Sequence, residues 1–211
     1  MPSEEVTTHA APTRIGRVAP GAAEPGDFVS APSVRWLFTS RAAGVPWLVV
    51  RVLLGLAWLR TGWDKVFGPA SAAWMEDGAA VRGFVQRAVA ASQTGEHPQV
   101  AYGWYVDFLR FVGDHSWFFA KLVAFGEVAI GIGLVLGAFT GIAAFCGVVL
   151  NFLFVFGGVA GENPAYLIAG ILLVLAWRNA GWYGLDRFLL PAFGTPWQRH
   201  HPWARGRVEM P

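Results

Sequence analysis

The chain has 211 residues, of which 55% are hydrophobic and only 14% are charged, and its mean hydropathy is +0.43. One soluble core of this size cannot bury so much apolar surface, so the composition excludes an ordinary soluble domain and indicates a membrane protein. The net charge of +2 comes from scattered arginines rather than from a basic patch, which excludes a nucleic-acid-binding protein and leaves membrane lipids as the expected contact.

The first part of the chain mixes Pro, Ala, Gly, Ser and charges of both signs, and it shows no helical or strand period. We therefore predict a disordered tail over residues 1–44. One domain is expected over residues 45–190, followed by a basic tail over residues 191–211.

Four apolar segments predict four transmembrane helices, at about residues 45–67, 116–138, 140–160 and 164–182. Glycines at the junction of the second and third segments mark a tight turn, and Pro164 stands in the first turn of the fourth, where a helix tolerates it. The expected fold is an all-α integral membrane four-helix bundle. Arginines are denser before the first span and after the fourth than in the loop between spans one and two, so both termini are expected in the cytoplasm.

The loop between spans one and two carries a helical pattern of its own. Apolar side chains recur there at helical spacing, namely Trp74, Val81, Phe84, Val85 and Ala88. We expect an amphipathic helix on the outer face, which either rests on the lipid headgroups or forms a lid over a cavity between the spans. Tyr102, Trp104 and Tyr105 follow and are typical of side chains at a membrane surface.

Several ionisable side chains fall inside the first span. Such groups cost about 2.5–3.5 kcal/mol each at bilayer depth, so they tend to face the interior of a bundle and to pair with one another. Helical periodicity places Arg51, Trp58 and Lys65 on one stripe. Arg60 and Asp64 share the opposite side and are spaced to pair with each other.

Polar side chains also occur in the second and third spans. Glu127 lies about 16 Å below the start of its span, and Asn151 falls at a comparable depth in the next. Arg51 and Arg60 bracket this depth, so arginine, glutamate and asparagine from three helices are expected to converge on one buried polar site. The same groups would also serve to lock the register of the helices without binding anything.

The absence of certain residue patterns restricts the chemistry. No histidine lies deep in a span, which excludes a bis-histidine haem, and no spacing typical of metal ligands occurs. The single cysteine, Cys146, excludes an internal disulfide. Redox chemistry would therefore require a lipid-soluble carrier or a partner protein.

Short motifs follow one another in order between Arg51 and Leu190. They are Arg51 with TGWDK at 61–65, WYVDF at 104–108, FGE at 125–127 with GIG at 131–133, NF at 151–152, NP at 163–164 and NAGWYGLD at 179–186. In these segments the chain resembles the DoxX family, which includes the DoxD-like small subunit of thiosulfate:quinone oxidoreductase.

The resemblance implies a four-helix bundle in the plasma membrane that serves as a subunit of a quinone-linked oxidoreductase, acting on sulfur compounds or in oxidative-stress redox handling. It favours menaquinone or ubiquinone bound between the helices, and a second oxidoreductase subunit or a soluble redox protein as partner. Two alternatives remain, which are a non-catalytic membrane anchor or scaffold for a soluble redox partner, and a small proton-linked transporter.

The quinone hypothesis assigns a role to each polar or aromatic group of the spans. As catalytic residues, Arg51 or Lys65 would polarise a quinone carbonyl and Glu127 would carry protons. The residues expected to contact the cofactor are Asn151, Trp58, Trp63 and Arg60.

Overall fold

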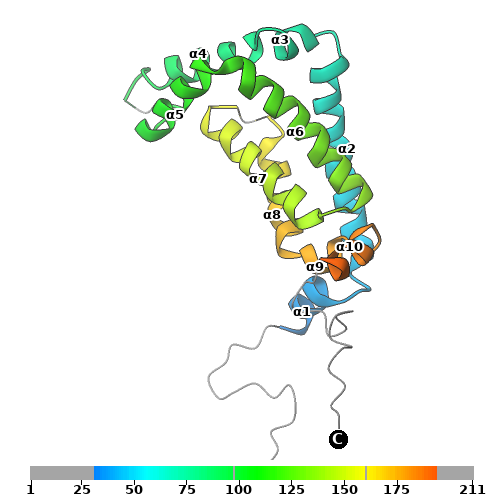
Figure 1. Cartoon of the computed structure of the whole chain (residues 1–211). Helices are drawn as coiled ribbons and strands as arrows, with labels where there is room; N and C mark the ends of the chain where they lie inside the picture. The colour runs from blue at the N-terminus through cyan, green and yellow to red at the C-terminus, as the bar shows by residue number, and fades with distance from the viewer. Residues whose placement is uncertain (1–30, 97, 160, 194–211) are drawn as a thin grey trace, which may run out of the picture. The chain divides into compact units, whose positions relative to one another are not determined.

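The computed structural model describes residues 31–96, 98–159 and 161–193, and the regular structure in these ranges is entirely α-helical (Figure 1). The helices are α1 Pro32–Thr39, α2 Gly44–Phe67, α3 Ser71–Met75, α4 Ala79–Ala91, α5 Gly103–Asp114, α6 Ser116–Leu136, α7 Thr140–Phe156, α8 Asn163–Leu175, α9 Trp177–Ala180 and α10 Asp186–Ala192. The all-α class predicted from the sequence is confirmed.

The most extensive helix pair is α2 with α6, and glycines determine how closely the two approach. A β-carbon added at Gly62 would lie 2.6 Å from the backbone nitrogen of Val128, and one added at Gly131 would lie 2.5 Å from that of Leu59. Only glycine permits such an approach of two backbones. Positions 62 and 59 of α2 therefore face positions 128 and 131 of α6, so the two helices run antiparallel in a defined register.

The outer surfaces of the long helices are apolar. Large hydrophobic side chains stand exposed on each of α2, α6, α7 and α8, for example Leu53, Phe125, Ile142 and Ile168. By length and composition α2 and α6 are able to cross a membrane, while α7 and α8 are shorter apolar helices. Exposed apolar surface of this extent is suited to lipid rather than to water.

Helices α3, α4 and α5 gather at one end of α2 and α6, which we call the loop end; the other end, with the turn between α6 and α7 at residues 137–139, is the hairpin end (Figure 1). Helix α4 buries Val81, Val85 and Ala88 against α5 and α6, and exposes its charged side chains. The loop between the first two apolar helices therefore forms a packed layer.

Tyr105 connects this layer to α7. Whereas Tyr102 and Trp104 are exposed, as expected at a membrane surface, Tyr105 is fully buried and its hydroxyl donates a hydrogen bond to the carbonyl oxygen of Leu153. Burial raises the pKa of the Tyr105 phenol to about 12. The grouping of all three rings as surface anchors was wrong for Tyr105, because the sequence does not show that α5 packs onto α7.

Two predicted boundaries differ from the structure. Residues 32–39, within the predicted tail, form α1, which is held by hydrogen bonds from the side chains of Asn179 and Trp47 to the carbonyl oxygen of Leu37 at 2.9 and 2.8 Å. The single helix predicted over 164–182 is interrupted at Ala176, between α8 and α9. Residues 1–30 and 194–211 of the two predicted tails lie outside the described residues.

Candidate functional site

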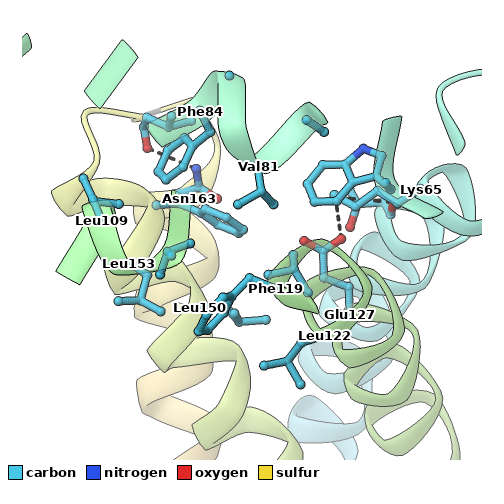
Figure 2. Close-up of a pocket in the computed structure, with 18 of the residues that line it drawn as sticks. Lys65, Val81, Phe84, Leu109, Phe119, Leu122, Glu127, Leu150, Leu153 and Asn163 are labelled. Atoms are coloured by element: carbon cyan, nitrogen blue, oxygen red, sulfur yellow. Dashed lines mark hydrogen bonds and ion pairs between the residues drawn. The ribbon is translucent and has the colours of Figure 1, made fainter. Parts of the chain in front are cut away.

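A cavity of about 710 Å³ lies at the loop end, lined by α2, the α3–α4 layer, α5, α6, α7 and the start of α8. Its wall is mostly apolar and aromatic, as shown in Figure 2 by Val81, Phe84, Leu109, Phe119, Leu150 and Leu153. Helices α4 and α5, which belong to the loop between α2 and α6, supply part of this wall. The loop therefore covers the cavity between α2, α6 and α7. A volume of this size is typical of a small-molecule site.

One ion pair stands in this apolar wall. The ammonium of Lys65 lies 2.5 Å from Oε2 of Glu127, and the two side chains are 18% and 2% exposed (Figure 2). The register of α2 and α6 accounts for the contact, because Gly62 faces Val128 and Lys65 follows one turn later on the same side of α2. The aromatic ring of Trp74 lies 5.0 Å from the same ammonium and covers it from α3.

The pair gives the cavity two chemical capabilities. Lys65 supplies a cation with three N–H donors, one of which is directed at Glu127. Glu127 supplies a carboxylate able to hold or pass on a proton. In an apolar wall both act more strongly on a bound molecule than they would in water.

Two further buried polar groups, Trp58 and Asn151, have no hydrogen-bond partner among the described residues. The indole nitrogen of Trp58, which lines the cavity, and both atoms of the Asn151 amide are in this state. A β-carbon at Gly147 would lie 3.2 Å from Nε1 of Trp58, so the indole nitrogen faces α7 one helical turn from Asn151. Buried polar atoms normally have partners, so both groups are exceptions within the described part of the chain, and Asn151 does not line the cavity.

Arg51 lies elsewhere, at the hairpin end. Its guanidinium donates hydrogen bonds to the carbonyl oxygens of Leu134 at 3.0 Å and Tyr183 at 3.4 Å, and it does not line the cavity. Along α2 it lies about 21 Å from Lys65 at the usual helical rise. The predicted convergence of Arg51 with Glu127 was therefore wrong, because the register of the helices brings Lys65 to the carboxylate instead.

Asp186 is a buried acid that the sequence analysis did not single out. Its carboxylate accepts hydrogen bonds from the backbone N–H groups of Phe139 at 2.6 Å and Thr140 at 2.9 Å, where α7 begins. An acid at a helix N-terminus and a cation, Arg51, at the C-terminus of α6 both complement the helix ends. Only the motif at 179–186 hinted at Asp186, and the role of both residues here is structural.

The remaining predicted residues, Arg60 and Trp63, lie on the outer side of α2. Both are exposed, and neither lines the cavity. Trp63 is 55% exposed and packs on the ring of Phe67 at 4.4 Å. No ion pair forms between Arg60 and Asp64, which are both within the described part of the chain. Their stripe is opposite to the one that packs on α6, so the structure does not bring them to the site.

Two cavity residues, Arg87 and Tyr166, were also absent from the sequence-based set. Arg87 comes from α4 and Tyr166 from α8. The hydroxyl of Tyr166 donates to Oε2 of Glu162 at 2.5 Å. Neither residue carried a signal, because an arginine in a loop and a tyrosine in an apolar helix are common without function.

Comparison with known proteins gives one match. The family model described as DoxX matches residues 46–160, which is more than half of the chain and includes Trp58, Lys65, Glu127 and Asn151. No curated protein and no solved structure matches the chain. The family match and the exposed apolar helices together identify a membrane protein with a possible link to redox chemistry.

Proposed function

The chain belongs to the DoxX family, and we propose that it is a membrane subunit of a quinone-linked oxidoreductase that binds a quinone in the cavity at the loop end. In this proposal α2, α6, α7 and α8 with α9 all cross the plasma membrane, and both termini face the cytoplasm. The observation that carries the proposal is the Lys65–Glu127 ion pair in the wall of a mostly apolar cavity.

The residues of the cavity fit a quinone in several respects. Aromatic and aliphatic side chains from seven helices provide a surface for a ring and an isoprenoid chain, and the volume of about 710 Å³ is in the range of small-molecule sites. Lys65 supplies a donor for a carbonyl oxygen. Trp58 contributes an indole whose nitrogen lacks a partner among the described residues. When bound, a quinone supplies a redox couple that takes up two electrons and two protons.

The chain's own residues would bind the ligand and handle protons. Of the three N–H donors of Lys65, one is directed at Glu127 and one at the carbonyl oxygen of Thr61 at 3.5 Å, and in this proposal the third binds a carbonyl oxygen of the ligand. In the ion pair the proton is on Nζ of Lys65, from which it would be delivered, and the carboxylate of Glu127 accepts a hydrogen bond from Nζ and holds it in place. Trp74 covers the ammonium and, with the apolar wall, excludes water from this transfer.

The electrons are proposed to come from a second oxidoreductase subunit or a soluble redox protein. Oxidation of sulfur compounds, or redox handling during oxidative stress, is the process that we propose on the basis of the family resemblance. The residues of the cavity bear only on the electron acceptor, the quinone, and not on the identity of the electron donor.

The test is to purify the protein in mild detergent, extract the bound lipids and search them for menaquinone and ubiquinone by mass spectrometry. We expect a quinone from the wild type and much less from Lys65→Met and Glu127→Gln. Lys121→Met is the matched control, because Lys121 lies on α6 but does not line the cavity. Absence of quinone from the wild type, together with no binding of added decylubiquinone in lipid nanodiscs, would refute the proposal.

A further inference from the structure

The cavity is open toward the outside between α6 and α7. Leu122 of α6 and Val149 of α7 both line it, and they are 54% and 41% exposed, so each residue belongs both to the cavity wall and to the accessible surface. Figure 2 shows Leu122 and Leu150 in the space between these two helices. We call the opening between Leu122 and Val149 the side portal.

The side portal exists because α6 and α7 separate as they run away from the turn that joins them. Near this turn the helices are close, since a β-carbon at Gly133 would lie 3.1 Å from Cβ of Ala143. Leu122 precedes Gly133 by eleven residues and Phe154 follows Ala143 by eleven, which places both about 16 Å further from the turn. At this level both residues line the cavity, so the cavity lies between the two helices.

The portal is apolar and opens onto an apolar surface. Apart from Glu127, the residues of α6 and α7 that line the cavity have hydrocarbon side chains, namely Phe119, Leu122, Val123, Val149, Leu150, Leu153 and Phe154. Phe125 and Phe145, one helical turn from Leu122 and Val149, are exposed on the surface of the same helices. Such a surface is suited to lipid, so the portal connects the cavity with the hydrocarbon layer of the membrane.

Other exposed parts of the cavity wall are less suited to an apolar chain. They are formed by Thr61, Ala79, Arg87 and Val159. Thr61 and Arg87 are polar, and the N–H of Ala79 donates a hydrogen bond to the carboxylate of Asp77 at 3.0 Å. A hydrocarbon chain here would displace water from charged groups, which costs free energy. The side portal is therefore the more favourable route for such a chain.

We propose that the ligand enters the cavity from the bilayer through the side portal, and that its apolar chain stays between Leu122 and Val149 while its ring is held at Lys65. This inference rests on the proposed function and goes beyond it, because it names the route of entry and the residues that accommodate the chain. The ligand class becomes a lipid-soluble molecule with a polar ring at one end and a chain that extends into the bilayer.

The experiment uses two tritium-labelled probes with the same ring, 2-methyl-1,4-naphthoquinone and its 3-decyl derivative. Binding to the full chain in lipid nanodiscs is measured for each probe, and binding to empty nanodiscs is subtracted to remove partition into lipid. The variants are Leu122→Trp and Val149→Trp, which narrow the portal. Leu136→Trp and Ile142→Trp are the matched controls, because Leu136 and Ile142 are 50% and 63% exposed on the same two helices and do not line the cavity.

Each portal variant is expected to raise the Kd of the decyl probe about tenfold, because the larger side chain occupies the place of the decyl chain. The Kd of the chainless probe is expected to change by less than about twofold, since its ring needs no room in the portal. The controls are expected to bind both probes as the wild type does. The Tm of all four variants should stay close to that of the wild type, because each replaced side chain is exposed.

Other results have definite meanings. Wild type that binds neither probe refutes the proposed function itself. Wild type that binds both probes, with portal variants that bind them equally well, overturns the portal and leaves the proposed function intact. A parallel loss of both probes in the portal variants also overturns it, because Leu122 and Val149 would then act on the ring or on the fold. An equal loss of the decyl probe in the controls overturns it as well, because the effect would then belong to the whole lipid-facing surface.

Discussion

Removal of Lys65 is expected to destabilise the protein more than removal of Glu127, although the two residues form one ion pair. The side chain of Glu127 is 2% exposed, whereas that of Lys65 is 18% exposed and lies near the ring of Trp74. Lys65→Met leaves a carboxylate buried without a counter-charge, which costs about 3–5 kcal/mol. Glu127→Gln leaves a hydrogen-bonding amide beside a lysine that still reaches the cavity, so a cost of about 1–2 kcal/mol is expected.

The double variant Lys65→Met/Glu127→Gln separates the two contributions. It removes both charges, so it is expected to be more stable than Lys65→Met alone by at least about 1 kcal/mol. The free energy of unfolding is measured by tryptophan fluorescence during reversible denaturation in mixed micelles, with Lys121→Met as control. Equal costs for the two single changes, or costs that simply add in the double variant, would refute the claim that the unpaired carboxylate dominates.

Three further predictions concern residues that the structure places outside the ligand cavity or in its wall. Arg51→Met removes hydrogen bonds to two backbone carbonyls and is expected to lower the free energy of unfolding by about 2–4 kcal/mol. The Kd for decylubiquinone should stay unchanged, and a raised Kd with normal stability would contradict this prediction. Asp186→Ala removes the acceptor for two N–H groups at the start of α7, and it is expected to lower the free energy of unfolding by about 1–2 kcal/mol. Amide hydrogen exchange at residues 139 and 140 should become faster, and unchanged exchange would contradict the capping role of Asp186. The pKa of Tyr105 is raised from 10.0 to about 12, so its contribution to stability is present below pH 10 and is lost as the pH rises toward 12. Between pH 10 and 12 the free energy of unfolding of Tyr105→Phe should therefore fall less steeply than that of the wild type, by about 1.4 kcal/mol per pH unit. Identical slopes for the two proteins would contradict the burial of this phenol.

Periodicity alone was sufficient to find the face of α2 that packs inward. The stripe predicted from the sequence contains Arg51, Trp58 and Lys65, and the structure buries the first two and half-buries the third. Burial of Glu127 and Asn151 is likewise explained by the cost of placing polar groups in lipid, which drives them toward the interior of a bundle. Both inferences concern which face of a single helix is buried, and they require no knowledge of how two helices pack together.

The partner of Glu127 required knowledge of two helices together. Counting depth from the ends of each segment favoured Arg51 or Arg60, because it assumed that the helices start level with each other. The register is instead determined where Gly62 and Gly131 let the backbones of α2 and α6 touch, and this brings Lys65 level with the carboxylate. The sequence shows the glycines but not which positions of the other helix they face.

The role of Asp186 could not be predicted from the sequence, for a different reason. It lies after the last apolar segment, where periodicity carries no information, and its effect depends on the chain returning to the turn between α6 and α7. There the backbone N–H groups of Leu185 and Asp186 donate to the carbonyl oxygens of Leu136 and Gly137 at 3.1 and 2.8 Å. Contacts between residues so far apart in sequence cannot be derived from local pattern.

The two ends of the α2–α6 pair use their charges differently, and this difference separates stability from binding. At the hairpin end Arg51 is directed at backbone carbonyls and Asp186 at backbone N–H groups, so their hydrogen bonds hold helix ends together and leave little for a ligand. At the loop end Lys65 and Glu127 bond mainly to each other, and both line the cavity. Substitutions at the hairpin end should therefore change the free energy of unfolding without changing ligand affinity, whereas Lys65→Met at the loop end should change both.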